Sequence, residues 1–144
     1  MAAELLNPAQ RNSLAVGLRA FEMHLRQIAA WLADGEEAGI FYRRRLDLSA
    51  ERRAAMREQI GLALARIAAL AERFDLAPAE EPLESSIAAL MSVDWANLCD
   101  LRADKLRRYG EVDGRLAGLL DADIAALADH ALALARAGRD TGET

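Results

Sequence analysis

Apolar residues recur at intervals of three and four along four long stretches of the chain, which is the spacing of one face of an α-helix. The first stretch predicts a helix over residues 8–34, with Asn7 as its N-cap, Pro8 in its first turn and Gly35 as its C-terminal stop. Its apolar positions are Leu14, Leu18, Phe21, Leu25, Ile28 and Leu32.

The second stretch has the same form and predicts a helix over residues 50–75, opened by Ser49 as N-cap with Glu51 in the first turn. Pro78 and Pro82 then interrupt the pattern, because proline lacks a backbone donor and clashes with the preceding helical turn. The apolar positions of this stretch are Met56, Ile60, Ala63, Ile67, Leu70 and Phe74.

The last two stretches predict a helix over residues 83–109, stopped by Gly110, and a helix over residues 114–137, in which Asp121 is a second candidate N-cap. Residues 139–144 are expected to form a frayed tail. The third stripe contains Leu83, Ile87, Leu90, Met91, Leu98, Leu101 and Tyr109. The fourth contains Leu116, Leu120, Ile124, Leu127, Ala131 and Leu134.

Four helices that are each apolar on one face bury those faces most simply together, so we expect an all-α, up-and-down four-helix bundle and a single domain over residues 1–144. The first connection is unusually long, at residues 35–48. Fully extended, it spans the length of a bundle, which leaves an overhand crossover open. Alternatively, residues 36–45 form an extra helical turn or an extension of the first helix, because long irregular connections are uncommon.

The composition agrees with this fold class. The chain has 144 residues, among them 32 Ala and 23 Leu against 9 Gly and 3 Pro, which favours helices and excludes an all-β fold. Hydrophobic residues make up 53% of the chain, enough for a core and too many for a disordered protein.

The charge limits the class of partner. Asp and Glu number 23 and Lys and Arg 18, and the net charge of −5 opposes nonspecific attraction to nucleic acid or anionic lipid. No stretch approaches the ~20 apolar residues of a membrane span. We therefore expect no nucleic-acid partner, no membrane association and, with Cys99 as the lone cysteine, a cytoplasmic location.

His24 and His130 are the candidates for metal or haem chemistry. Phe21 and Leu127 stand three residues before them, where a di-iron bundle has glutamate, so we expect no metal site. Haem is harder to exclude, because the two histidines flank the first and fourth stripes, and histidines on facing helices suit its axial positions. We favour the interpretation that both histidines lie at the boundary of the apolar core, where each hydrogen-bonds to a neighbouring residue or to water and binds no cofactor.

The one locally basic region lies in the long connection and carries three apolar residues before three arginines. Such residues stack on bases and grip phosphates in nucleic-acid-binding proteins. We favour another interpretation, in which the apolar trio covers one end of the bundle while the arginines are solvated or paired with Glu36, Glu37 and Asp47. Docking of a partner protein is the third option. The segment consists of Ile40, Phe41, Tyr42, Arg43, Arg44 and Arg45.

Asp94 and Lys105 lie near the centre of the third apolar stripe, at positions expected to face the core. Buried charges require partners, so we favour an ion pair that fixes the packing register. If the helix instead breaks near Ser92, Asp94 is an N-cap. The functional alternative is an acid and a base in a ligand pocket. Its other members would be Trp95, Arg102 and Tyr109.

No nucleophile with a matching base is evident, since Cys99 has no histidine nearby and the serines occupy no recognisable turn motif. We therefore expect a non-enzymatic helical-bundle protein that acts through protein–protein interaction or self-association, and we expect a homodimer. The alternative is a bundle that binds a small molecule or haem, an enzyme included, through the polar residues of the third helix or the two histidines.

Overall fold

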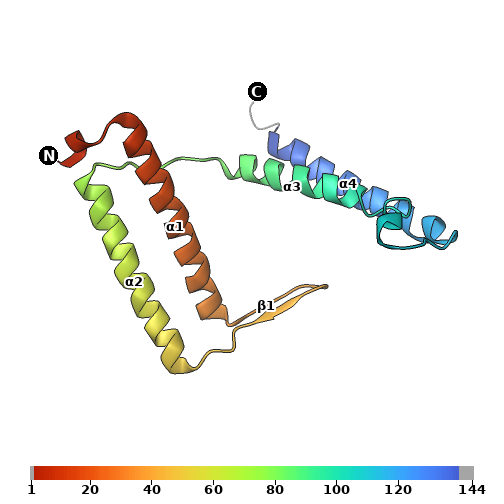
Figure 1. Ribbon diagram of the computed structural model, residues 1–144, viewed down its shortest axis with the longest axis horizontal. Helices are drawn as coiled ribbons and strands as arrows, with labels where there is room; N and C mark the ends of the chain where they lie inside the picture. The colour runs from red at the N-terminus through yellow and green to blue at the C-terminus, as the bar shows by residue number, and fades with distance from the viewer. Residues whose placement is uncertain (1, 140–144) are drawn as a thin grey trace. The chain divides into compact units, whose positions relative to one another are not determined.

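The computed structural model describes residues 2–139, and within them the regular secondary structure is helical apart from one small sheet (Figure 1). The long helices are α1 (Pro8–Asp34), α2 (Ala50–Arg73), α3 (Leu83–Cys99) and α4 (Leu116–Arg139). The shorter elements are the 3-10 helices η1 (Ala2–Leu5) and η2 (Leu106–Tyr109) and the strands β1 (Glu36–Ala38) and β2 (Arg43–Arg45). The predicted all-α, four-helix fold class is thus confirmed.

The chain divides into two compact units, Met1–Pro78 and Ala79–Thr144. α1 and α2 form an antiparallel hairpin in the first unit, and α3 and α4 form one in the second (Figure 1). The antiparallel pairing of α1 with α2 means that the first connection does not run along the helices, so the overhand crossover is wrong. That residues 1–144 form a single domain stays a prediction.

The ends of α1 are fixed by the residues that the sequence indicated. The Asn7 side chain accepts a hydrogen bond from the Gln10 backbone N–H at 2.8 Å, and the Gln10 side chain accepts one from the Asn7 N–H at 3.0 Å. At the other end Gly35 has φ 69° and donates its N–H to the Trp31 carbonyl at 2.8 Å. This left-handed conformation favours glycine and ends the helix.

The first hairpin buries branched aliphatic side chains. Leu25, Leu32 and Ile60 form its core, against which Ile28 and Ile67 pack. The Arg57 guanidinium of α2 also donates to the Leu32 carbonyl of α1 at 3.2 Å. Phe21 and Met56, which belong to the predicted stripes, remain exposed.

The first connection is a β-hairpin, so the expected extra turn or extension of α1 over residues 36–45 is wrong. β1 and β2 pair antiparallel, with Glu36 opposite Arg45, Glu37 opposite Arg44 and Ala38 opposite Arg43. The left-handed turn at Gly35 stops helical hydrogen bonding, and opposite charges across the two strands favour their pairing.

α3 ends at Cys99, ten residues before the predicted end at Tyr109. The N–H groups of Asp100 and Leu101 bond the carbonyls three residues back, which tightens the last turn. The backbone N–H of Ala103 then donates to the Asp121 carboxylate of α4 at 2.8 Å instead of a helical carbonyl. A tertiary hydrogen bond therefore replaces the expected continuation of the helix.

The second hairpin buries small side chains, and its helices approach closely. Ala128, Ala131 and Ala135 of α4 are buried, as is Ala88 of α3. A Cβ built on Gly138 would lie 2.7 Å from the Glu84 carbonyl oxygen, a distance too short for real contact. α4 begins at Leu116 and passes through Asp121 without interruption, so Asp121 is not its N-cap. Its last residue is Arg139, and residues 140–144 of the predicted tail lie outside the described part.

Candidate functional site

The β-hairpin between α1 and α2 forms an arm, defined here as residues 36–45, that projects from the end of the first hairpin (Figure 1). At its base the Leu46 N–H donates to the Gly35 carbonyl at 3.0 Å, and near its tip the Gly39 N–H donates to the Tyr42 carbonyl at 2.9 Å. The Tyr42 ring lies directly over Gly39, where a Cβ would come within 2.7 Å of it. These contacts define one conformation of the arm.

Charged pairs on both faces of the arm reinforce it. Arg43 donates to Glu36 at 2.6 Å and Arg44 donates to Glu37 at 3.4 Å. The Arg44 guanidinium also lies 4.7 Å from the ring centroid of Trp31, which anchors the arm to α1. The predicted pairing of the arginines with Glu36 and Glu37 is thus present for two of them. All of these groups are solvent-exposed, so each pair contributes little to stability.

The tip of the arm carries apolar side chains without packing partners. Ile40 and Phe41 are 97% and 98% exposed, and Tyr42 is half exposed. The expectation that this trio covers the end of the helices is therefore wrong for Ile40 and Phe41, because the strands hold them beyond the helix ends. Two-residue hairpin turns normally carry Asn, Asp or Gly, so their local structure does not explain two large apolar residues here.

A groove of about 430 Å³ between α3 and α4 contains two of the predicted site residues. Asp94 and Asn97 of α3 and His130 of α4 supply its polar groups. Its apolar lining is formed by Met91, Leu98, Leu101, Leu127, Ala131 and Leu134. Asp94 and His130 were not expected to share a site, and the antiparallel packing of the two helices brings them to one groove.

The buried ion pair predicted for Asp94 is wrong, because Asp94 is exposed and no ion pair within residues 2–139 involves it. The N-cap alternative is also wrong, since α3 runs unbroken through Ser92. The face of α3 turned toward α4 carries Ala88 and Ser92, and Arg139 of α4 donates to the Ser92 hydroxyl at 2.6 Å. The larger residues of the predicted stripe, such as Leu90, remain exposed with Asp94 among them.

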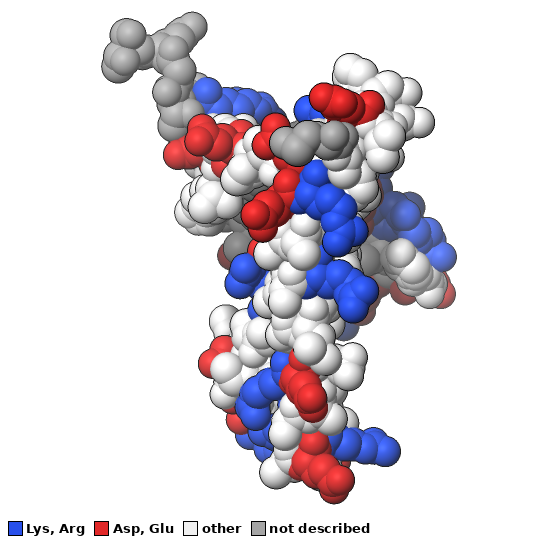
Figure 2. Space-filling view, turned by 90° about the vertical axis from the view of Figure 1, so that its left-hand side faces the viewer, with Lys and Arg blue, Asp and Glu red and all other residues white. Residues whose placement is uncertain are grey.

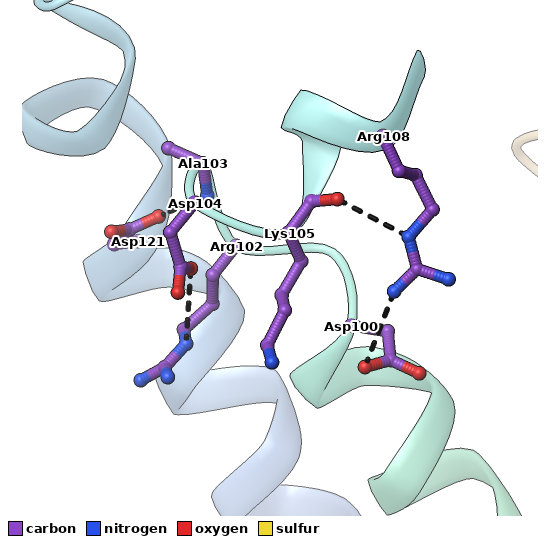
Figure 3. Close-up of polar contacts among 7 residues, drawn as sticks. All are labelled: Asp100, Arg102, Ala103, Asp104, Lys105, Arg108 and Asp121. Atoms are coloured by element: carbon purple, nitrogen blue, oxygen red, sulfur yellow. Dashed lines mark hydrogen bonds and ion pairs between the residues drawn. The ribbon is translucent and has the colours of Figure 1, made fainter. Parts of the chain in front are cut away.

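Lys105, Arg102 and Tyr109 lie beyond the end of α3, in its connection to α4, and so not on one helical face with Asp94. The Lys105 side chain makes none of the ion pairs drawn in Figure 3. Tyr109 is exposed, and the Arg108 guanidinium lies 5.8 Å from its ring centroid. Trp95 is 41% exposed on α3 and lies outside the groove lining.

The same connection is held by polar contacts that the sequence did not indicate (Figure 3). Asp121 accepts the Ala103 N–H at 2.8 Å, Arg108 lies 3.8 Å from the Asp100 carboxylate, and Arg102 lies 4.0 Å from the Asp104 carboxylate. A charged residue early in an apolar helix pattern was the only sequence signal for Asp121. The Ala103–Asp121 hydrogen bond ties the connection to α4, whereas the two exposed ion pairs contribute little to stability.

His24 belongs to the first unit and His130 to the second, and both are exposed. A haem shared by the two histidines stays the untested alternative, and the absence of a cofactor stays the prediction. Among residues 2–139, no cluster of three or more His, Cys, Asp or Glu side chains has the geometry to hold a metal ion. In the same residues, no helix has the length and hydropathy needed to cross a bilayer.

Comparisons with protein-family models, with curated proteins and with solved structures found no match. We therefore infer the chemistry of the candidate sites from their own residues. The arm carries an apolar tip followed by arginines, and the second hairpin carries an apolar groove with one carboxylate. Both arrangements suit binding. Over the face in view in Figure 2, basic and acidic side chains alternate with uncharged surface.

Proposed function

We propose that this protein is a non-enzymatic helical protein that acts by binding another protein chain, in the first place a second copy of itself. The observation that carries the proposal is the near-complete exposure of Ile40 and Phe41 at the tip of the arm. Large apolar side chains held in water on a defined scaffold are typical of interaction surfaces, because their burial by a partner is favourable.

Further exposed apolar residues on the helices support the same function. Phe21 and Met56 line a groove of about 380 Å³ on the first hairpin, and Leu127 and Leu134 line the groove of the second. All four side chains are more than a third exposed. Each hairpin thus presents an apolar face beyond the one that its two helices bury against each other.

The test is the mass of the protein in solution. Light scattering across micromolar concentrations should give about twice the 15.7 kDa of one chain. The double variant Ile40→Ser with Phe41→Ser should shift the equilibrium toward the monomer, whereas Leu119→Ser, which removes another exposed leucine, should not. A wild-type mass of one chain at every concentration would contradict self-association.

A small-molecule function is the second candidate, favoured by the presence of Asp94 and His130 in one apolar groove. A carboxylate and an imidazole in such a groove suit an amphipathic ligand that carries a cation. Native mass spectrometry of freshly purified protein would detect such a ligand, and an absorption spectrum would detect haem. A native mass equal to that of the protein without any ligand, together with an absorption spectrum that lacks a Soret band, would contradict this candidate.

The expected absence of nucleic-acid partners and the cytoplasmic location stay predictions. The net charge of −5 supports the first. Submicromolar binding to DNA or RNA that falls steeply with salt and is abolished by neutralising Arg43, Arg44 and Arg45 would overturn it.

A further inference from the structure

The tip of the arm is not buried by the unit that carries it. Ile40 and Phe41 make no packing contribution to their own unit, and the backbone bonds at Gly35 and Gly39 hold the strands that carry them. Because the arm is already ordered, burying the tip would not require the loss of conformational freedom that a disordered segment pays on binding.

The edges of the arm are poorly suited to self-pairing. If two copies joined antiparallel through β2, the arginines at positions 43–45 of one strand would face those of the other, and joining through β1 would bring Glu36 and Glu37 together. Like charges on adjacent strands are destabilising, and charged edges are a common protection against strand addition. The tip is therefore the part of the arm that is suited to bind.

The chemistry of the tip also indicates the kind of surface it fits. Arg43 follows two residues after Phe41, and its bond to Glu36 uses only Nε of a guanidinium that has five N–H donors. A complementary surface is an apolar groove with a carboxylate inside or beside it.

Among the described residues, two predominantly apolar grooves can be compared. The groove on the first hairpin, of about 380 Å³, is lined by apolar residues and Gln59 and contains no charged group. The α3–α4 groove, of about 430 Å³, contains Asp94, for which no ion pair is found within residues 2–139. Charge complementarity therefore selects the α3–α4 groove.

We propose that Ile40 and Phe41 of one copy dock into the α3–α4 groove of a second copy, with Arg43 beside Asp94. Each copy carries one arm and one α3–α4 groove, and a two-fold dimer formed by reciprocal docking would use both twice. This proposal rests on the proposed self-association and assigns its contacts.

The first experiment compares dimer dissociation constants by sedimentation equilibrium for the full chain. The tip variant is Ile40→Ser with Phe41→Ser, and the groove variant is Leu127→Lys. Each should weaken the dimer by about tenfold or more, the loss expected from removing buried apolar contacts. Leu119→Lys is the matched control on α4, since Leu119 is exposed and lies outside the groove. Circular dichroism of each variant checks that its helices are retained.

Mixing the two variants tests the pairing of arm with groove. The tip variant keeps an intact groove and the groove variant keeps an intact arm, so an equimolar mixture should form a heterodimer more tightly than either variant forms a homodimer. In a parallel test, Asp94→Lys should weaken the wild-type dimer by about tenfold, whereas Asp129→Lys, an equal change of charge outside the groove, should alter it by less than about twofold.

The outcomes separate this inference from the proposed function. A wild-type dimer that the tip and groove variants leave unchanged would overturn the docking and retain self-association. A wild-type monomer would overturn both. A wild-type monomer that floats with anionic phospholipid vesicles, and loses this binding in the tip variant, would overturn both and assign the tip to a lipid surface.

Discussion

The two helical hairpins of this protein bury side chains of different size between their helices. The first buries Leu25, Leu32 and Ile60, and the second buries mainly alanines, with Ala135 wholly inaccessible. Large side chains hold two helices apart and fill the space between them, whereas alanine and glycine let the backbones approach. Gly138, which faces the Glu84 carbonyl, marks such an approach in the second hairpin.

This difference affects what each hairpin leaves exposed. In α3, the small residues face α4, and larger residues such as Leu90 remain exposed, as does Asp94. Both hairpins leave an apolar groove exposed. The groove of the second contains the Asp94 carboxylate, and the first also carries the arm with its apolar tip. We therefore expect the first hairpin to be most sensitive to shrinking a buried residue, and the second to adding volume where its helices approach closely.

Leu32→Ala should have the largest effect, because Leu32 is 1% exposed and its loss leaves a cavity between α1 and α2. We expect a loss of about 3 kcal/mol in the free energy of unfolding of the first hairpin. Each unit contains one tryptophan, so urea titrations followed by Trp31 fluorescence in a Trp95→Phe background report on this hairpin. Leu119→Ala, at an exposed site, should change stability by less than about 0.5 kcal/mol. Equal effects of the two substitutions would contradict the assigned core.

Gly138→Ala tests the second hairpin by enlargement. The new Cβ would lie 2.7 Å from the Glu84 carbonyl oxygen, and we expect a net loss of about 1–2 kcal/mol after the modest gain in helix propensity. Gly61→Ala on α2 meets no atom within 4 Å and should stabilise the first hairpin by about 0.5–1 kcal/mol. Urea titrations followed by Trp95 and by Trp31 fluorescence measure the two effects. A stabilising Gly138→Ala would show that α3 and α4 do not approach closely there.

The sequence was informative where local signals decide the structure. Asn7, Gly35 and Ser49 act as the predicted caps, and α1 has its predicted bounds. Local signals did not predict the end of α3, because that end depends on a residue far along the chain. α3 keeps its apolar spacing beyond Cys99, yet the Ala103 N–H bonds to Asp121, eighteen positions along the chain. Periodicity does not reveal such a partner.

The candidate site was predictable in part for the same reason. The residues of the arm were identified from their composition, but not their β-structure, which consists of backbone pairing between residues 36–38 and residues 43–45. Asp94 was identified as unusual because it interrupts an apolar stripe. Its exposure could not be read from that stripe, because the stripe does not show that α4 packs against the smaller residues beside it.

Asp121→Ala should have a smaller effect than the two core substitutions, and only on the second hairpin. It leaves the partly buried Ala103 N–H without its acceptor, and we expect a loss of about 1–1.5 kcal/mol. Asp121→Asn retains an oxygen at the accepting position and should recover most of this loss. Urea titrations followed by Trp95 fluorescence compare the two variants. An asparagine variant as unstable as the alanine variant would indicate that charge, and not the hydrogen bond, holds the connection.

The smallest expected effect concerns how the second helix of each hairpin begins. α2 begins at the Ser49 hydroxyl, which accepts the Arg52 N–H at 3.2 Å and does not titrate. Before α4, the Asp113 carboxylate instead accepts the Arg115 side-chain and backbone N–H groups at 2.9–3.0 Å. The side-chain bonds first, and then the backbone bond, hold the pKa of Asp113 below its ordinary value. The Asp113 contact before α4 should therefore depend on acid pH, whereas the Ser49 contact at the start of α2 should not.

A lowered pKa in the folded state means that this contact stabilises the fold fully above roughly pH 4 and ceases to do so as the pH falls through the lowered value. NMR titration of the Asp113 carboxyl carbon should show the lowered midpoint. In Arg115→Ala the pKa should rise toward its ordinary value without reaching it, because the backbone N–H of residue 115 still donates to the carboxylate. An unchanged midpoint in that variant would show that the guanidinium does not hold the carboxylate in solution. The start of α4 would then rest on its backbone bond alone, as the start of α2 rests on the backbone bond to Ser49.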